Sequence, residues 1–262
     1  MEDPIGMKDP IGKKDRIGLF LTCLVDLTRP QIAHATKNLL QCAGFQVTIP
    51  EQSCCGQPAY NSGHQSAASD IAKTTIKVFE GYDYIVTPSA SCASHIKHHI
   101  PALFTKEPDW AEKARALGKK TYELTHFLFT IAEMNEVNTA YNGRIYYHES
   151  CSSRRESKSP AARALLSRIK GAEVLELGDN AACCGFGGLF SVSYPSLSNA
   201  MLNAKIAPLN QAEDAILTGL DLGCLLNIAS KLKKEGLSIK AYHIAELLNG
   251  PLDQVAISDP ET

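Results

Sequence analysis

The sequence has no excess of positive charge, because its 26 lysines and arginines are outnumbered by 28 aspartates and glutamates. Proteins that bind phosphate backbones carry a basic patch or stripe, and none is present, so we expect no nucleic-acid partner. Long apolar runs are also missing. The longest one near the N-terminus, residues 17–25, is too short to span a bilayer, and the charged, proline-bearing residues before it do not resemble a secretory signal. We therefore predict a cytoplasmic protein without a transmembrane segment.

Signatures of nucleotide and flavin cofactors are absent as well. The glycine-rich segment 185–188 lacks the Gly-x-Gly-x-x-Gly spacing, and no Gly-Lys-Ser/Thr follows it. If the protein takes part in hydride removal, a cofactor or subunit outside this chain has to supply that chemistry.

The sequence does contain nine cysteines, and 44% of its residues are hydrophobic. That apolar content is sufficient for a core without disulfides. In a reducing compartment, cysteines more often hold metal or perform redox chemistry than form structural disulfides. A disulfide within either adjacent pair, Cys54-Cys55 or Cys183-Cys184, would close a strained ring.

Short apolar strands alternate with helical segments along the chain, which predicts an α/β fold with largely parallel sheets. The predicted strands are residues 17–22, 45–49, 84–87, 144–148, 173–177 and 215–218, and the predicted helices are residues 30–44, 64–80, 160–170, 195–210 and the segments after Cys92 and Gly223.

The pattern is duplicated, and the cysteines follow the duplication. Cys54 comes 31 positions after Cys23, and Cys183 comes 32 positions after Cys151. Residues 120–124 also resemble residues 240–244. We therefore expect two pseudo-symmetric lobes, each with a mostly parallel sheet flanked by helices. The expected segments are a flexible N-terminal extension (1–16), a first lobe (17–138), a second lobe (139–250) and a C-terminal tail (251–262).

Eight of the cysteines are predicted to form two metal sites. Within each lobe they follow the carboxyl ends of strands, which meet at one edge of a parallel sheet. A glycine after each pair, Gly56 or Gly185, lets both thiols turn toward one ligand, and the last cysteine opens a helix whose dipole stabilises a thiolate. The candidate ligands are Cys23, Cys54, Cys55 and Cys92 in the first lobe and Cys151, Cys183, Cys184 and Cys224 in the second.

Four thiolates suit either an iron–sulfur cluster or structural zinc. The absence of the two Cys-x-x-Cys clips common in zinc folds favours iron–sulfur, with zinc at one or both sites as the alternative. A set of buried, chemically inert cysteines is the other alternative, and it explains two parallel sets of four poorly. Cys42 has no counterpart in the second half and is expected to lie in the core.

These motifs resemble the cysteine-rich CCG domain, which occurs twice in a subunit of heterodisulfide reductase and in the iron–sulfur subunit of glycolate oxidase. In detail they are closest to the lactate utilisation protein A family, over residues 17–249. The motifs that carry this resemblance are Thr22-Cys23-Leu-Val-Asp26, CCGQPAYNSG at 54–63, Thr87-Pro88-Ser89 followed by Ser91-Cys92, CCGFGG at 183–188, and Gly219 with DLGC at 221–224.

The resemblance implies an iron–sulfur electron-transfer subunit of a complex that oxidises L-lactate to pyruvate. Its implied partners are a ferredoxin-type iron–sulfur subunit and a third lactate-utilisation subunit, with a 2-hydroxy acid as the small-molecule substrate of the complex. A zinc-bearing scaffold, or a CCG subunit of a glycolate oxidase or disulfide reductase, is the alternative function.

The sequence departs from the family patterns in two places. The fuller CCG pattern ends in Cys-x-x-Cys, whereas this chain has Ser89 and Asp221 at the penultimate position. Each site thus has four candidate ligands, which favours two ordinary [4Fe-4S] clusters over a non-cubane type. Ser152 also stands where the lactate family tends to carry a histidine, so no role of that histidine transfers to this chain.

Several other polar residues are candidates for supporting roles. His148 is expected to be a hydrogen-bonded structural histidine or, alternatively, to hydrogen-bond a cluster thiolate. Arg154 and Arg155 are expected either to neutralise a carboxylate substrate or the cluster charge, or to form a solvated pair. His95 and His99 are spaced to share one face of a helix, which we expect to be exposed.

Overall fold

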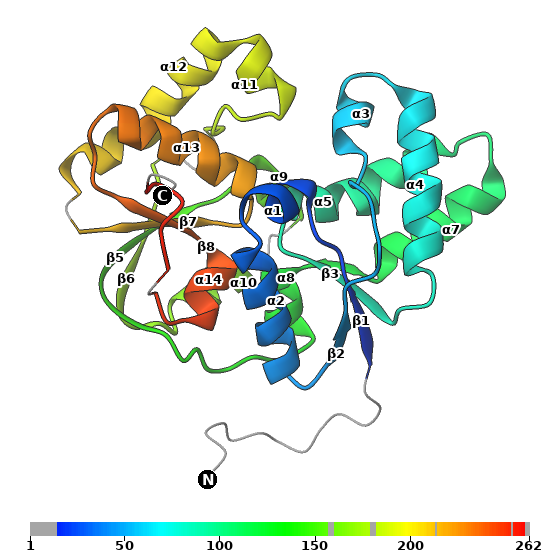
Figure 1. The fold of residues 1–262 in the computed structure, drawn as a ribbon, viewed down its shortest axis with the longest axis horizontal. Coiled ribbons are helices and arrows are strands. Elements are labelled where there is room, and N and C mark those ends of the chain that lie inside the picture. Colours follow the sequence, from blue (N-terminus) through cyan, green and yellow to red (C-terminus); the bar gives the residue numbers. More distant parts are fainter. Residues whose placement is uncertain (1–14, 157–159, 179–181, 213, 253, 260–262) are drawn as a thin grey trace.

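The computed structural model describes residues 15–156, 160–178, 182–212, 214–252 and 254–259. They contain two four-stranded sheets, and every strand pairing within them is parallel (Figure 1). The first sheet has the order β2-β1-β3-β4, and the second has the equivalent order β6-β5-β7-β8. The strands are β1 (Arg16–Leu19), β2 (Gln46–Thr48), β3 (Tyr84–Thr87), β4 (Thr121–Glu123), β5 (Ala140–His148), β6 (Lys170–Glu176), β7 (Ile216–Gly219) and β8 (Lys240–His243).

Helices flank both sheets, which confirms the predicted α/β architecture of two repeated lobes. The first lobe contains α1 (Cys23–Thr28), α2 (Gln31–Cys42), α3 (Gln57–Asn61), α4 (Gln65–Phe79), α5 (Ala90–Ser94), the π-helix η1 (His95–His99), α6 (Ile100–Leu103), α7 (Pro108–Lys119) and α8 (Leu124–Thr130). The second contains α9 (Cys151–Glu156), α10 (Ala161–Leu166), α11 (Leu189–Ser193), α12 (Pro195–Ile206), the 3₁₀ helix η2 (Ala207–Gln211), α13 (Leu222–Lys234) and α14 (Ile244–Asn249).

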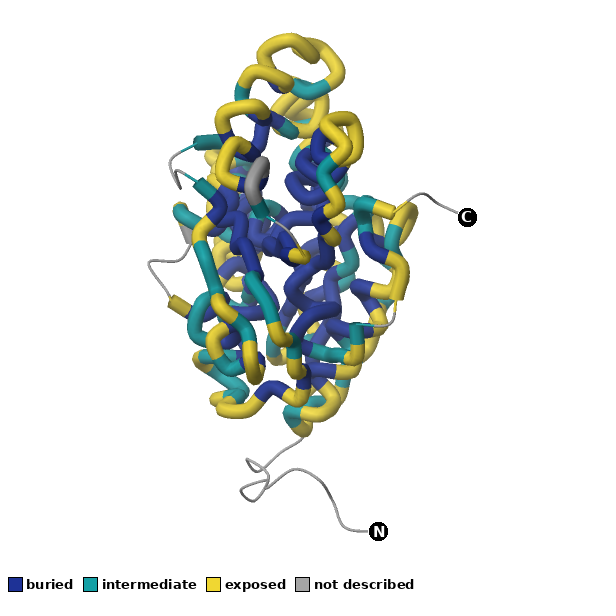
Figure 2. Tube along the Cα trace, turned by 90° about the vertical axis from the view of Figure 1, so that its left-hand side faces the viewer, coloured by how far each residue is buried: buried dark blue, intermediate teal, exposed yellow. Residues whose placement is uncertain are grey.

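The largest hydrophobic core is shared by the two lobes. It includes Leu39 of α2, Phe127 of α8, Leu165 of α10 and Leu247 of α14, and helix α14 packs on α2 as α8 packs on α10. Smaller cores lie on the outer side of each sheet. Figure 2 shows the buried residues running through the middle of the molecule, with exposed residues around them. The shared core fixes how the two sheets sit against each other, and therefore where their carboxyl edges meet.

Strand β1 begins at Arg16, inside the expected extension 1–16, whose residues 1–14 lie outside the described part of the chain. Among the described residues, no helix has the length and apolar character needed to cross a membrane.

Candidate functional site

The cysteines of the first lobe lie at the carboxyl edge of its sheet. Cys23 is the first residue of α1, directly after β1, and Cys92 lies in the first turn of α5, after β3. Side-chain caps hold both turns, since Thr22 Oγ1 accepts a hydrogen bond from Val25 N and Ser89 Oγ accepts one from Cys92 N. Cys54 and Cys55 lie in the loop between β2 and α3. We call these four cysteines the first-lobe site.

The four thiols of the first-lobe site form a continuous chain of contacts. Cys55 Sγ lies 3.4 Å from Cys92 Sγ, and Cys54 is hydrogen-bonded to both Cys23 and Cys55. Hydrogen bonds from Cys23 and Cys55 lower the pKa of Cys54 to about 2, whereas the pKa of Cys23 is raised, first by its bond to Cys54 and then by burial. The chain of thiols therefore favours negative charge on Cys54, the form that binds metal.

The second-lobe site, made of Cys151, Cys183, Cys184 and Cys224, repeats this arrangement. Cys184 Sγ lies 2.9 Å from Cys224 Sγ, and Cys183 is hydrogen-bonded to Cys151, which raises the pKa of the Cys151 thiol. Gly185 N donates to Cys183 Sγ at 3.4 Å. The two sites are thus built from the same contacts at equivalent positions.

The Cys-Cys-Gly turns have the geometry that their sequence predicts. Gly56 and Gly185 have φ values of +87° and +75°, which L side chains rarely adopt. In both lobes the glycine N–H donates to the first thiol of the pair, Cys54 or Cys183. At Gly185 an added Cβ would also lie 2.8 Å from Ser198 O. Both turns therefore require glycine, and they present an amide donor to a thiolate.

Exposure follows the same order in both lobes. The last two cysteines of each site are buried, and the first two reach the surface at least partly. All nine cysteines are free thiols, including both adjacent pairs. The expectation that Cys42 lies in the core is wrong, because the buried face of α2 ends at Leu40 and Cys42 is exposed in its last turn.

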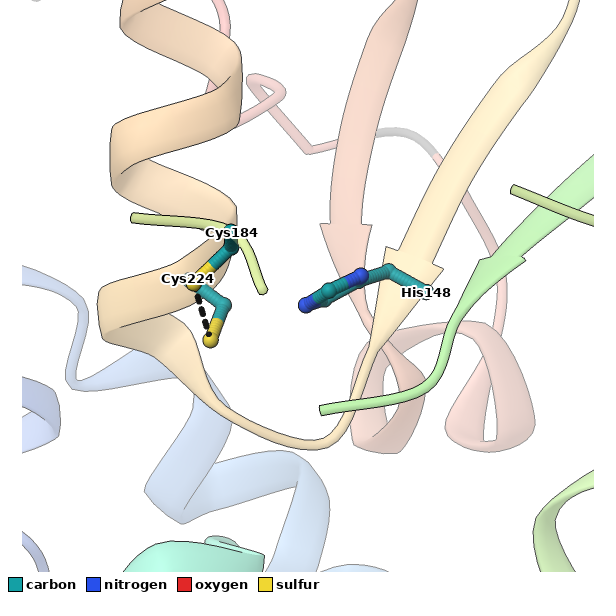
Figure 3. A group of neighbouring side chains, drawn as sticks. All are labelled: His148, Cys184 and Cys224. Carbon is teal, nitrogen blue, oxygen red and sulfur yellow. Dashed lines mark hydrogen bonds between the residues drawn. The ribbon is translucent and has the colours of Figure 1, made fainter. Parts of the chain in front are cut away.

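His148 points from the end of β5 toward the second-lobe site (Figure 3). A ligand atom of His148 and the sulfurs of Cys184 and Cys224 all lie within 4.8 Å of one another. The side chain is buried, and neither ring nitrogen has a hydrogen-bond partner among the described residues. The interpretation as a hydrogen-bonded structural histidine is therefore wrong. Burial lowers the pKa of His148 to about 3, so the ring is neutral.

His95 is buried, so the prediction of an exposed histidine face is wrong for this residue. The prediction assumed 3.6 residues per turn, but residues 95–99 form a π-helical turn with a wider repeat, which packs against α7. The His95 ring stacks on His99 with ring centroids 5.5 Å apart and meets Tyr60 edge-on at 5.4 Å. Burial lowers the pKa of His95 to about 4.

Ser89 and Asp221, which stand where the fuller CCG pattern has a further cysteine, form a polar bridge between the lobes. Asp221 Oδ1 accepts hydrogen bonds from Ser89 Oγ at 2.8 Å and from Ser91 N at 2.9 Å. Its other oxygen, Oδ2, accepts one from Ser150 Oγ at 2.5 Å. Ser89 and Asp221 are the two penultimate positions of the repeated motif, so residues that would be ligands in the fuller pattern connect the two sites instead.

Glu123, at the end of β4, is a second buried carboxylate near this bridge. Its Oε2 caps α8 by accepting hydrogen bonds from Thr125 N and His126 N, while Oε1 has no partner among the described residues. Burial raises the pKa of Glu123 to about 7, although these hydrogen bonds oppose the shift. The carboxyl is therefore neutral in the folded protein under mildly acidic conditions.

Replacing Glu123 by Gln is expected to flatten the pH dependence of stability. A folded-state pKa above the unfolded one stabilises the protein fully below about pH 4.5, and this contribution is lost as pH rises through about 7. Across that window, the free energy of unfolding of the wild type should fall by up to ~1.4 kcal/mol per pH unit relative to that of Glu123→Gln. Urea unfolding at several pH values measures the difference. Glu112→Gln, on the exposed face of α7, is the control and should keep the wild-type dependence of stability on pH. If stability depends on pH in Glu123→Gln as it does in wild type, the prediction is wrong.

The two arginines after Cys151 differ in their surroundings. Arg154 is half-buried and close enough to His148 to lower its pKa, whereas Arg155 is exposed and lies 3.5 Å from His99 Nε2. Lys205 of α12, which the sequence did not single out, is fully buried and acts on His148 in the same direction. Two cationic side chains therefore lie close to His148.

A pocket of 390 Å³ opens beside Cys23 and Cys54. Its charged lining residues in the described part of the chain, Asp26 and Glu51, are both acidic. Leu27 and Ile49, also in its lining, are 80% and 41% exposed. This pocket gives access to the first-lobe site but repels a carboxylate substrate.

The donor chemistry of both sites fits a thiophilic metal. Each brings four thiols into contact, two of them buried, with a backbone amide and an imidazole nearby. Such donor sets suit iron–sulfur clusters and zinc, and they do not suit Mg²⁺ or Ca²⁺, which select oxygen ligands.

Comparison with known proteins gives matches over most of the chain. A family model described as "CCG: Cysteine-rich domain" matches residues 17–97 and 145–229, one match in each lobe. Lactate utilization protein A of Geobacillus sp. (strain WCH70) is 44% identical over 233 residues, which are 88% of this chain and 98% of that protein. The proteins of the same name from Geobacillus kaustophilus and "Lactate utilization protein A 2" from Bacillus cereus (strain AH820) are 43% and 41% identical over 88% of this chain, covering 97% and 96% of their own lengths.

Proposed function

The chain belongs to the lactate utilization protein A family of CCG cysteine-rich domain proteins, and from that premise we propose that it is an iron–sulfur electron-transfer subunit of a cytoplasmic complex that oxidises L-lactate to pyruvate. The observation that carries the proposal is the pair of equivalent four-thiol sites at the carboxyl edges of two parallel sheets. In each lobe the Cys-Cys-Gly turn adds an amide donor to the thiols, and hydrogen bonds of this kind tune a cluster.

The proposed cofactors are two [4Fe-4S] clusters, held by Cys23, Cys54, Cys55 and Cys92 and by Cys151, Cys183, Cys184 and Cys224. Such a cluster supplies one-electron transfer when bound. The protein's own residues offset its negative charge with amide hydrogen bonds such as that from Gly185 N to Cys183 Sγ. Four thiols with Ser89 and Asp221 in place of a fifth support this cluster type over a non-cubane one.

The proposed partners are a ferredoxin-type iron–sulfur subunit and a third lactate-utilisation subunit. Support comes from the exposure of the outer thiols, since Cys23, Cys54, Cys151 and Cys183 reach the surface, where a second redox protein can approach. The acidic lining of the pocket beside Cys23 argues against lactate binding there. We therefore place oxidation of the 2-hydroxy acid in a partner subunit, with this chain as the relay. The lobes are proposed to span 17–138 and 139–250, with 251–262 as a tail.

Metal and acid-labile sulfide analysis of anaerobically purified protein tests the proposal. Two four-iron clusters should give a brown protein with about eight iron and eight sulfide per chain. A colourless protein with zinc and no sulfide would instead establish the zinc-bearing scaffold. Deletion of the gene should abolish growth on L-lactate but not on glycolate, and loss on glycolate alone would reassign the substrate.

A further inference from the structure

We propose that His148 is a metal ligand of the second-lobe site, so that this site combines imidazole and thiolate donors. The proposal deepens the proposed function, on which it rests, because it makes the two metal sites chemically different. The sequence motifs supply only cysteines, and because a zinc ion or a four-iron cluster takes four protein donors, His148 then replaces one of the four thiols as a donor.

The geometry of His148 is that of a metal ligand. The residue ends β5, and its ring points at the thiols of Cys184 and Cys224 (Figure 3), with the three ligand atoms within 4.8 Å of one another. In the described part of the chain, no other group of three or more histidine, cysteine or acidic ligand atoms is this compact. The side chain is 1% exposed, and both ring nitrogens lack a hydrogen-bond partner among the described residues. A buried nitrogen without a partner is costly, and coordination to a metal removes that cost for one of the two ring nitrogens.

The first lobe has no donor at the equivalent position, which is Phe20. Both residues stand three positions before the first cysteine of their site. The sheet registers agree, because Leu19 pairs with Val86, which places Phe20 opposite Thr87, and His148 pairs with Gly219. Thr87 and Gly219 each precede the last cysteine of their lobe by five positions. Phe20 is fully buried against Phe79, with ring centroids 5.5 Å apart.

His95 provides a matched control, because it is the corresponding buried histidine of the first lobe but comes from a different element. Its ring nitrogens also lack partners among the described residues, and it lies near Cys54. However, its ring stacks on His99 and meets Tyr60 edge-on, and it belongs to no compact group of ligand atoms in the described chain.

Zinc loading of the full-length chain tests the assignment without depending on the native group. The protein is stripped of metal anaerobically, reloaded with Zn²⁺ alone and examined by X-ray absorption at the zinc edge. Wild type should show nitrogen scattering at about 2.0–2.1 Å beside sulfur at about 2.3 Å. His148→Phe, which copies the residue of the first lobe, should lose the nitrogen contribution, while His95→Phe should retain it. A nitrogen that only hydrogen-bonds a thiolate lies too far from zinc to give this signal.

Phe20→His extends the test in the opposite direction and should increase the nitrogen contribution by placing an imidazole in the first-lobe site. Sulfur-only scattering in zinc-loaded wild type, or nitrogen retained in a folded His148→Phe protein, would overturn the proposal. If His148→Phe does not fold, nitrogen retained in His95→Phe supports the assignment, and sulfur-only scattering in wild type overturns it. The proposed function fails separately, through absence of iron and sulfide from the unstripped protein.

Discussion

Cys184→Ser and Cys54→Ser are each expected to lower the iron and sulfide content of the anaerobically purified protein by about half. Each removes one thiolate from a four-thiolate site, and serine is a poor ligand for iron in such a cluster. The lobes repeat the same contacts independently, so the untouched site should keep its cluster. Iron, acid-labile sulfide and the visible spectrum, measured per folded chain, give the result.

Cys42→Ser is the matched control. Cys42 is a free thiol exposed at the end of α2, and it belongs to neither of the two repeated sets of four cysteines. It should retain the full wild-type iron and sulfide. Equal iron in all three variants would break the assignment of the ligands. Loss of all iron in either single-site variant would show instead that the two sites do not fill independently.

Asp221→Ala is expected to cause a large loss of stability. The carboxylate accepts hydrogen bonds from Ser89 Oγ, Ser91 N and Ser150 Oγ, and Asp221 is 5% exposed. Removing it leaves these donors without their acceptor. Each such hydrogen bond to a charged group contributes about 1.5–3 kcal/mol to stability, and local rearrangement recovers part of the loss. We expect a net loss of about 3–5 kcal/mol and a fall in Tm on the order of 10 °C.

Thermal unfolding of the anaerobic protein measures this effect, with Asp70→Ala as the control. Asp70 is exposed on α4, and a substitution there should change stability by no more than about 0.5 kcal/mol. Asp221→Asn should fall between the two, because the amide keeps one oxygen for Ser89 and Ser91. Matching Tm values for Asp221→Ala and Asp70→Ala would show that the bridge contributes nothing to the stability of the lobe contact.

The sequence was sufficient to predict the two parallel sheets and their duplicated order, because the apolar runs that form β1, β3, β5 and β7 alternate clearly with helical segments. It missed β4 and β8 as strands, although residues 120–124 and 240–244 were recognised as a repeat. Their sequences, Thr-Tyr-Glu and Lys-Ala-Tyr-His, contain polar and charged residues and form no apolar run that would identify a buried strand.

The side chains whose surroundings the sequence did not predict are those placed by packing between segments that lie far apart in the chain. His95 is buried at the start of a π-helical turn that packs against α7, where its ring meets Tyr60 edge-on, and a helical wheel does not anticipate that turn. The burial of Lys205 near His148 has no sequence signal that we recognise. Asp221 was identified only as a missing cysteine, since its partners Ser89 and Ser150 lie 132 and 71 positions away.

The reciprocal packing of α14 on α2 and of α8 on α10 has a consequence for folding. Each lobe ends in a helix that packs on the second helix of the other, and Arg29 adds a 2.8 Å ion pair to Glu246 across the α14–α2 side of this contact. Unfolding one lobe would strip the apolar cover from its neighbour, so both should melt in one cooperative transition. A ligand bound in either lobe then protects the whole chain against unfolding, and the integrity of each thiol site depends on residues more than a hundred positions away.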